Sequence, residues 1–424
     1  MPLSIITGKL MIILYFIPKI DKDNSTTFGN MLLNNIGNTA EAHLLTPRTE
    51  DIAHFEGIKI HYLSAYPIMI KRNKKRFGKV VNKIKPDIIH ILGVWNMTAS
   101  YIEKWALEKQ IPVVISPLKG FAPWNIRHSY FTCKLPKLVM FQHKMVKNAH
   151  AMHALSRQEM EFVKNMAWHP SLNEQKPWNT HVCVIQNPEE TNETSIAETM
   201  AKMARLYGKT IDSNPFLAMT DSDRMCENTL LRVGLATDNL SAVITQEAKE
   251  LLTSIDEASW RRILLHAYDE KIYDFIIKGA MAMHMNRRSI DIEKIERFGK
   301  NTTAINEAQT SKGHKALKII ETYRQYETEG EICKMIFDVI YRMNHKALCR
   351  KHLAELYAKM RFNDYNEHIL VEMLKRMNIK KSAARLMQIM NETMGLEMGF
   401  MPMEPLDDKK TNIIRNTLFK SEIQ

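Results

Sequence analysis

Short apolar runs alternate with amphipathic stretches from the start of the chain to Asn192, and no other feature constrains the fold as strongly. The runs have strand length and are continuously apolar, which is typical of strands buried on both faces of a parallel sheet. They are Met11–Ile17, Ala42–Leu45, Ile58–Tyr62, Asp87–Ile91, Pro112–Ile115, Ala149–Ala154 and Val182–Ile185. The stretches between them have helical spacing and are Asn30–Ile36, Lys71–Lys85, Ser100–Lys109, Pro136–Lys147 and Arg157–Met166. Strands separated by helices predict βαβ crossovers, so we expect residues 1–192 to form an α/β, Rossmann-like domain.

The pattern changes after Asn192, where apolar residues recur at helical spacing and almost no run resembles a strand. The helical stretches are Ser195–Tyr207, Gln246–Thr253, Trp260–Met285, Gly313–Gln325, Ile332–Tyr341, Leu353–Met360, Lys380–Thr393 and Asn412–Phe419. We therefore expect residues 193–424 to form a mainly α-helical region. A linker near residues 208–224, rich in turn-forming residues, would divide it. Many of the 28 methionines fall here, and such residues more often fill a core than form an adaptable binding face.

The chain is basic, with a formal net charge of +12 and a pI of about 9.2. Its densest basic run, Lys71–Arg76, lies on an expected amphipathic helix. Such a run either forms a solvated surface or attracts an anionic partner. No RNA-binding signature or helix-turn-helix pattern accompanies it, so no nucleic acid partner is expected. The favoured partners are phosphate groups or the surface of an anionic membrane.

The cysteines and the N-terminal stretch bear on location. The five cysteines are far apart and none has metal-binding spacing to a histidine, a pattern typical of a reducing compartment. The apolar stretch Leu3–Ile17 is interrupted by Lys9, is too short to span a bilayer and precedes no cleavage site. We therefore expect a buried first strand and a cytoplasmic location. Contact with the inner face of the plasma membrane would be peripheral.

Ligands of doubly wound sheets bind beyond the carboxyl ends of the strands, and this rule selects four segments of the chain. The first is Asp87–Trp95, a strand that runs into a loop. His90 either contacts a ligand phosphate or hydroxyl or is a buried histidine bonded to the next loop, and both interpretations stay open. Gly93 either lets the backbone approach a ligand or makes the turn. Trp95, at the end of the segment, is a further candidate for substrate binding.

The second segment is Ile111–Trp124, an expected buried strand that ends in a loop containing two prolines. Lys119 is placed to meet a phosphate, and Trp124 can face a sugar or a base. Gly120, between them, completes the candidate loop. The alternative is a purely structural loop in which Trp124 is a hydrophobic residue at a helix start.

The third segment is Ala151–Glu159, in which Ser156 and Glu159 have the spacing of a capping box that opens a helix after a strand. The amides of this helix start and Arg157 can accept an anion, although capping alone explains Ser156 and Glu159. The fourth segment is Val184–Pro188, which contributes Asn187.

Together and in this order, the four segments resemble the N-terminal domain of GT-B-fold glycosyltransferases of family four, of the type found in bacterial capsule and surface-polysaccharide clusters. The stretches that carry the likeness are Lys85–His90, the serine-proline loop ending Pro123-Trp124, Ala154–Glu159 and Ile185–Pro188. The resemblance covers less than half of the chain. It implies a domain that binds a glycan or lipid-linked acceptor and faces a second domain that binds the nucleotide-sugar donor.

The chain also departs from this family. Pro18–Asn30 holds a single glycine where the family has a glycine-rich turn, and Leu118-Lys119 stands where it commonly has His or Arg followed by Gly. After Asn192 we find neither a basic pair for a donor diphosphate nor paired glutamates for the nucleotide ribose in a strand-helix setting. Glu250 and Glu257 have about the required spacing but lie among helical patterns.

Two further groups are weaker candidates. Cations cluster around an expected helix near Trp260, as on any surface helix; they are Arg261, Arg262, His266, Lys271 and Lys278. Asp221-Ser222-Asp223 has the spacing of a metal-binding aspartate pair but falls in the expected linker, so neither a metal nor another cofactor is expected.

The sequence favours a divergent glycosyltransferase that moves a sugar from a nucleotide-sugar donor to a glycan or lipid-linked acceptor in surface polysaccharide synthesis. The alternative is a non-catalytic, glycosyltransferase-like scaffold or partner subunit without a donor site. The missing donor signature supports the alternative, and the loop around Lys119 and Trp124 supports the enzyme.

Overall fold

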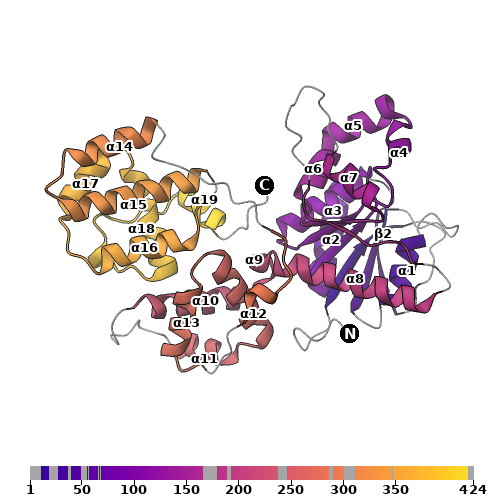
Figure 1. Cartoon of the computed structure of the whole chain (residues 1–424), viewed down its shortest axis with the longest axis horizontal. Helices are drawn as coiled ribbons and strands as arrows, with labels where there is room; N and C mark the ends of the chain where they lie inside the picture. The colour runs from indigo at the N-terminus through magenta and orange to yellow at the C-terminus, as the bar shows by residue number, and fades with distance from the viewer. Residues whose placement is uncertain are drawn as a thin grey trace. The chain divides into compact units, whose positions relative to one another are not determined.

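The computed structural model forms two compact units (Figure 1). It describes residues 11–18, 27–36, 40–48, 55, 57–64, 66, 68–165, 179–188, 192–236, 246–285, 290–299, 311–345 and 347–418. Most of Leu3–Ile17, the loop after it, Met166 and Phe419 lie outside the described residues. The first unit consists mainly of Met1–Ala218 with Glu296–Phe298, and the second of Met219–Ile295 and Gly299–Ile423. Within these described ranges, no helix is long and apolar enough to cross a membrane.

A seven-stranded parallel sheet forms the centre of the first unit, with strand order β3-β2-β1-β4-β5-β6-β7. Its strands are β1 (Ile12–Phe16), β2 (Glu41–Pro47), β3 (Lys59–Leu63), β4 (Ile88–Leu92), β5 (Val113–Ser116), β6 (Ala151–Ala154) and β7 (Val182–Val184). Each coincides with a predicted strand to within about three residues, a normal uncertainty of element ends. The Rossmann-like interpretation of the first part of the chain is confirmed.

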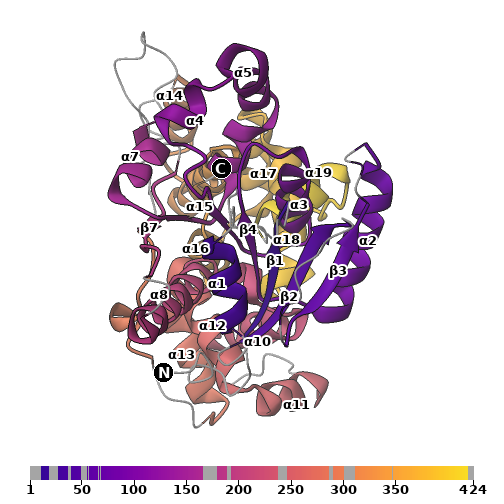
Figure 2. The same ribbon diagram turned by 90° about the vertical axis from the view of Figure 1, so that its right-hand side faces the viewer.

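Helices cover both faces of this sheet, which explains why the strands are apolar throughout. The elements are α1 (Thr27–Ile36), α2 (Ile70–Ile84), α3 (Met97–Glu108), α4 (Pro123–Arg127), η2 (Tyr130–Lys134), α5 (Leu135–Lys137), η3 (Leu138–Gln142), α6 (His143–Asn148), α7 (Arg157–Asn165), α8 (Glu193–Asp212) and α9 (Pro215–Ala218). On one face, α2, α3, α6 and α7 bury side chains such as Phe77 and Trp105 against the strands. On the other, α1 and α8 bury Leu33, Met203 and Tyr207 (Figure 2).

The first unit extends beyond residue 192, the boundary expected from the sequence. The reason is α8, whose apolar stripe packs on the sheet together with α1. Asn192 accepts a hydrogen bond from the amide of Ser195 and so starts this helix. The division between the units falls at Ala218–Met219, inside the segment 208–224. That segment is largely helical rather than a linker, since α8, α9 and α10 occupy most of it.

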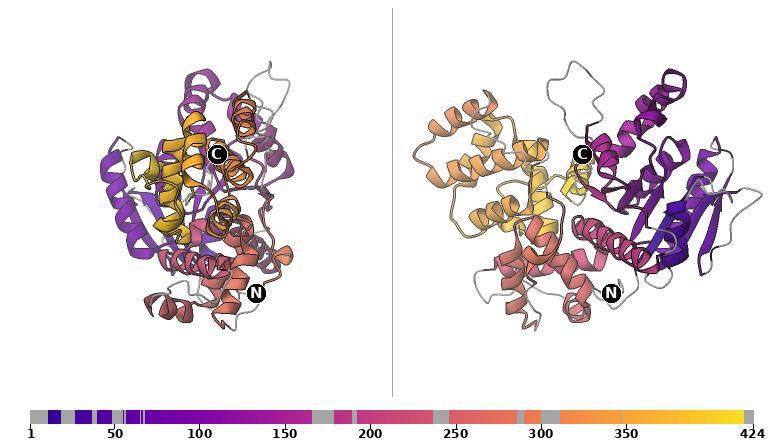
Figure 3. Two further views of the ribbon diagram at one scale, coloured as in Figure 1. Left: turned by 90° about the vertical axis from the view of Figure 1, so that its left-hand side faces the viewer. Right: turned by 45° about the vertical axis from the view of Figure 1, so that its right-hand side comes forward.

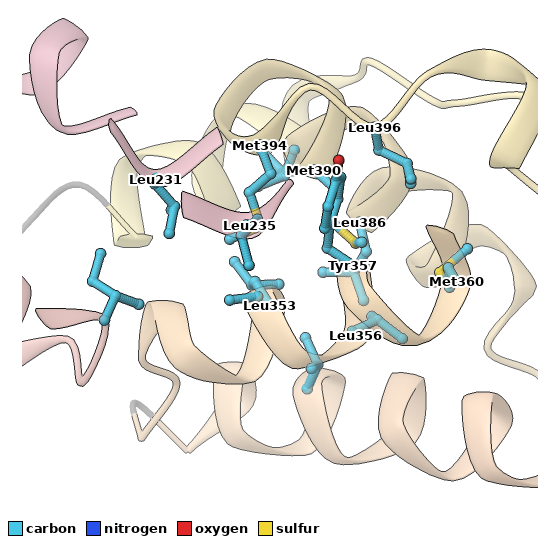
Figure 4. Packing of buried hydrophobic residues seen from close by; sticks show 14 of the residues in the cluster. Leu231, Leu235, Leu353, Leu356, Tyr357, Met360, Leu386, Met390, Met394 and Leu396 are labelled. Carbon is cyan, nitrogen blue, oxygen red and sulfur yellow. The ribbon is translucent and has the colours of Figure 1, made fainter. Parts of the chain in front are cut away.

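The second unit is helical in every element that the structure describes, as expected. Its elements are α10 (Asp221–Leu235), α11 (Gln246–Ser254), α12 (Glu257–Asp269), α13 (Tyr273–Ala282), η4 (Ile292–Lys294), α14 (Ser311–Glu321), α15 (Glu327–Asn344), α16 (Arg350–Arg361), α17 (Glu367–Arg376), α18 (Lys380–Met394), η6 (Met398–Phe400) and α19 (Lys409–Leu418). One core joins them, and Figure 4 shows leucines of α10 and α16 meeting methionines of α16 and α18. Met373, Met387 and Met390 are buried there, whereas Met281 is exposed.

Two glycines let helices α10 and α13 cross at close range. A Cβ on Gly234 would lie 1.9 Å from the carbonyl oxygen of Phe275, and one on Gly279 would lie 2.1 Å from that of Leu230. Neither position has room for a larger residue. The predicted single helix Trp260–Met285 is in fact α12 and α13, because the chain turns between them at Lys271, which has a φ of 56°.

Candidate functional site

Four neighbouring strands carry the predicted site loops to the same edge of the sheet. Strands β4, β5, β6 and β7 are adjacent and parallel, so the loops that follow them lie side by side at their carboxyl ends. These loops contain Gly93 and Trp95 after β4, Lys119, Gly120 and Trp124 after β5, Arg157 after β6, and Asn187 after β7. We call this group of loops the carboxyl-edge site. His90 lies within β4 rather than in a loop.

The β5 loop begins with a strained turn. The amide of Gly120 donates to the carbonyl of Pro117 over 2.9 Å, and the two residues between them, Leu118 and Lys119, have φ values of 52° and 62°. A turn with both central residues in the left-handed region is normally built from Asn and Gly. Non-glycine residues held in this conformation concentrate at functional sites. Gly120 is required for a different reason, since a Cβ there would lie 2.3 Å from Val94.

Glu159 fastens this turn to the neighbouring loop. Its carboxylate accepts hydrogen bonds from the backbone amides of Lys119, at 2.6 Å, and Leu155, at 2.8 Å. Ser156 caps α7 as predicted, because its hydroxyl accepts from the amide of Glu159 over 3.1 Å. Burial raises the pKa of Glu159, while the two amides and the Lys119 charge oppose that rise. The local sequence indicates only that Glu159 belongs to a capping box. Its hydrogen bond to Lys119, 40 positions earlier, cannot be recognised from the sequence.

Trp95 joins the β4 and β5 loops from inside. Its indole Nε1 donates to the carbonyl of Gly120 over 2.7 Å, and its backbone amide donates to the buried side chain of Gln142. The ring packs edge-on against Phe121, at a centroid distance of 5.6 Å. Only 7% of Trp95 is exposed. It is therefore a positioning residue of the site rather than a surface for substrate, and Gln142 is a positioning residue that the sequence analysis missed.

Gly93 makes the turn after β4. It has a φ of 116°, a conformation that residues with a side chain rarely adopt, and its amide donates to the carbonyl of Ser116 over 2.8 Å. A Cβ at this position would meet only the ring of Pro18, at 3.5 Å. The backbone conformation, rather than lack of space, therefore accounts for this glycine.

Of the predicted site residues, those whose side chains are exposed to solvent are Lys119, Trp124, Arg157 and Asn187. Trp124 is 68% exposed at the start of α4, so it is not a buried capping residue. Together they provide two cations, an amide and an aromatic plane. Cations of this kind bind phosphate, and an indole face stacks on sugar or base rings.

His90 belongs to a fully buried chain of hydrogen bonds under the site. Its Nδ1 lies 2.8 Å from the Tyr207 hydroxyl, and its Nε2 lies 2.7 Å from the hydroxyl of Ser116. The Ser116 hydroxyl is also 2.7 Å from Nδ1 of His153, whose Nε2 donates to the carbonyl of Ile185 over 2.8 Å. Of the two interpretations of His90, the buried histidine is the one that this geometry fits.

A single arrangement of protons satisfies this chain. Burial lowers the pKa of His153 to about 4 and that of His90 well below its usual value, so both rings are neutral. Because the carbonyl of Ile185 can only accept, the proton of His153 is on Nε2 and Ser116 donates to Nδ1. The same reasoning gives His90 a proton on Nε2 and makes Tyr207 its donor. The chain fixes strands β4, β5 and β6 and helix α8 relative to one another.

Two of the cations considered near Trp260 are not surface charges. His266 is buried on α12 and bonds the carboxylate of Glu227 over 2.7 Å, and Arg350 bonds the other oxygen of the same carboxylate over 2.5 Å. Arg262 pairs with Asp223 over 3.0 Å. Asp223 itself completes the capping box of α10 with Thr220. This cluster holds helices α10, α12 and α16 together.

Groups that could bind a metal or act as a reactive thiol were sought among the described residues. No group of three His, Cys, Asp or Glu side chains within the described ranges could hold a metal ion. All five cysteines are free, and burial raises the pKa of four of them, Cys183, Cys226, Cys333 and Cys349. A raised pKa disfavours the reactive thiolate.

Comparison with known proteins identifies no relative of this chain from which a function could be inferred. No family model matches the chain, and no curated protein matches it.

Proposed function

We propose that this protein is a divergent glycosyltransferase that uses the carboxyl-edge site to bind phosphate-bearing sugar substrates. One observation carries the proposal: the adjacent loops after β4, β5 and β6 are fastened together, through Glu159 and Trp95, around exposed Lys119 and Arg157. A rigid group of cations and helix starts is what stabilises a nucleotide diphosphate leaving group. The reaction would move a sugar from a nucleotide donor to a glycan or lipid-linked acceptor of surface polysaccharide synthesis. The resemblance to GT-B enzymes of family four supports this assignment.

Each exposed side chain has a role in this proposal. Lys119 and Arg157 would hold phosphate oxygens of the donor or of a phosphate-linked acceptor. Trp124 would stack on a sugar ring, and Asn187 would bond a sugar hydroxyl. Gly93, Gly120 and Trp95 would keep the loops at the required spacing. In this scheme the protein would work in the cytoplasm, at the inner face of the plasma membrane when the acceptor is a lipid.

A specific observation favours a second function, that of a non-catalytic scaffold or partner subunit. GT-B enzymes hold the nucleotide in a second Rossmann-like domain, yet in residues 219–418, as far as they are described, every element is a helix. A scaffold would keep the acceptor loops and leave the donor to another protein. The two functions differ in whether this chain binds a nucleotide.

Thermal unfolding of the full chain with a panel of nucleoside diphosphates and nucleotide sugars separates the two functions. A ligand present at a hundred times its Kd stabilises the native state by about 2.7 kcal/mol, so binding raises the melting temperature. We expect a shift with one nucleotide family, and its loss in Lys119→Ala. The matched control is Lys109→Ala, because Lys109 is exposed shortly before β5 and so lies near the amino ends of the strands, away from the site loops.

The outcomes decide between the functions. A shift that survives in Lys109→Ala and is lost in Lys119→Ala supports the enzyme with its phosphate site at the carboxyl edge. A shift that both variants retain places the nucleotide elsewhere and overturns the role of Lys119. Flat traces from a chain that unfolds cooperatively support the scaffold.

A further inference from the structure

Two groups of large apolar side chains are exposed on the first unit. The 66–70 patch consists of Tyr66, Ile68, Met69 and Ile70, with exposed fractions between 36 and 89%. It connects the carboxyl end of β3 to the start of α2. Single exposed apolar residues are ordinary on protein surfaces, but exposed apolar side chains at four of five successive positions are unusual.

The second group, the 124–140 patch, consists of Trp124, Phe131, Val139 and Met140, with exposed fractions between 67 and 79%. These residues lie on the helical turns between β5 and α6, which extend beyond the sheet (Figure 3). The turns include π-helical segments, Tyr130–Lys134 and Leu138–Gln142. The inward side of this segment buries Leu138, Gln142 and Met145, so the exposed side chains form its outer face.

Each patch lies in a stretch of sequence without acidic residues. Residues 57–86 contain nine Lys or Arg and no Asp or Glu, and residues 109–158 contain eight Lys or Arg and no Asp or Glu. On α2, Phe77 and Val81 face the core, while Lys71, Arg72 and Lys75 are exposed. Around the second patch, Arg127, Lys144 and Lys147 are exposed. Acidic side chains reach these cations only from other segments, as where Glu108 pairs with Lys74 over 2.6 Å. Exposed apolar side chains among an excess of cations are the composition of surfaces that enter the headgroup region of an anionic bilayer.

The two patches belong to the same edge of the sheet. One follows the carboxyl end of β3 and the other that of β5, and the order β3-β2-β1-β4-β5 puts four strand spacings between these ends. At about 4.8 Å per spacing the ends are about 19 Å apart. Both patches therefore start from the same edge of the sheet. Nucleic acid would match the charge and could stack on Tyr66, Trp124 and Phe131, but it would leave the aliphatic side chains in water. A bilayer surface takes Ile68, Val139 and Met140 out of water as well.

We propose that the carboxyl edge of the first unit docks on anionic membrane surfaces, with the 66–70 and 124–140 patches inserted among the lipid headgroups. Lys and Arg around the patches attract the surface, and the apolar side chains then leave water. The docked edge is also the one that carries the loops of the carboxyl-edge site, and Trp124 belongs to both, so the sugar that it would stack on is one held in the headgroup layer. If the proposed transferase activity holds, on which this last step rests, the acceptor is lipid-linked and is taken from the bilayer surface rather than from solution.

Vesicle co-sedimentation of the full chain tests the proposal. We expect binding to vesicles of phosphatidylcholine mixed with phosphatidylglycerol, little binding to phosphatidylcholine alone, and weakening by salt. Ile68→Ser and Val139→Ser should each weaken binding by about tenfold. A change of this size corresponds to the free energy gained when part of one aliphatic side chain leaves water. The matched control is Ile413→Ser, because Ile413 is 63% exposed on α19 of the second unit. Quenching by brominated lipid should occur in the parent and fall in Trp124→Phe.

Several outcomes would overturn the docking surface. They are the absence of binding to anionic vesicles, equal binding to neutral vesicles, and binding that Ile68→Ser and Val139→Ser leave unchanged. A duplex DNA or RNA that binds more tightly than the vesicles would assign the surface to nucleic acid. None of these measurements uses a nucleotide, so the docking proposal and the transferase proposal fail or succeed separately.

Discussion

Glu103 gives the sharpest test of the packing in the first unit. It lies on α3 and is 3% exposed, and its Oε1 has no hydrogen-bond partner among the described residues. Burial raises the pKa of Glu103 from 4.5 to about 8, although Lys144 and Asn148 on α6 lower it in part. The folded protein therefore keeps this carboxyl protonated at pH 7, whereas the unfolded chain does not.

The sign and size of the effect follow from this pKa. Between pH 4.5 and 8 the folded state binds a proton that the unfolded state has lost, so stability falls as pH rises, and the loss is complete above pH 8. At 1.36 kcal/mol per pH unit the loss is at most about 5 kcal/mol, and water penetration reduces it to about 2–3 kcal/mol. Glu103→Gln keeps the shape and removes the titration.

Thermal and urea unfolding at pH 5 and pH 8.5 measure this difference. We expect Glu103→Gln to match the parent at pH 5 and to exceed it by about 2–3 kcal/mol at pH 8.5. The control is Glu198→Gln on α8, whose carboxylate is already in water and whose loss should change little at either pH. A gain of equal size at both pH values, or a loss at pH 8.5, would refute a buried carboxyl with a raised pKa.

Three further perturbations test other parts of the structure. Glu159→Gln should lower the free energy of unfolding by about 1.5–3 kcal/mol, because it weakens two charge-assisted hydrogen bonds. Hydrogen exchange at the Lys119 and Leu155 amides should accelerate, and unchanged exchange would contradict the link between the loops. Acid should destabilise the first unit as pH falls from 6.5 to about 4, because burial lowers the pKa of His153 to about 4 and the unfolded chain binds the proton first. In urea titrations, His153→Gln should remove up to about 3 kcal/mol of that loss, and a pH profile equal to that of the parent would count against a buried neutral His153. Gly279→Ala should cost more than about 3 kcal/mol because its Cβ would meet the Leu230 carbonyl, whereas Gly208→Ala, with open space around it on α8, should be neutral or stabilising in the same unfolding assay; equal effects would exclude the close helix crossing.

The sheet could be predicted almost completely because its strands are buried on both faces. A strand such as Val113–Ser116 must then be apolar at every position, which distinguishes it from an amphipathic helix nearby. Helix α8 was also predicted, but not the unit to which it belongs. Its spacing of apolar residues shows that one face is buried without showing against what, so the boundary was expected at residue 192.

The site was predicted at the level of its loops and not of its contacts. The carboxyl-end rule selected the loops that contain Lys119 and Arg157 correctly as neighbours. The left-handed turn at Leu118-Lys119 has no local signal, because neither residue favours that conformation. Trp95 follows a glycine in a loop, and its burial depends on Gly120 and Gln142, which come from other elements. Contacts of this kind depend on the packed fold rather than on spacing.

The hydrogen bond between Tyr207 and His90 limits where gene rearrangement can divide this chain. The sheet alone, ending near residue 188, would lack the Tyr207 hydroxyl that bonds His90 and would expose the apolar surface that Met203 and Leu206 cover. A gene rearrangement that separates the sheet from α8 should therefore yield a product with part of one core face open to water. The smallest heritable module is the sheet together with α8. Recombination that exchanges the helical unit for another should have its breakpoint after Ala218, and the incoming unit must then replace Glu296–Phe298, which belong to the first unit.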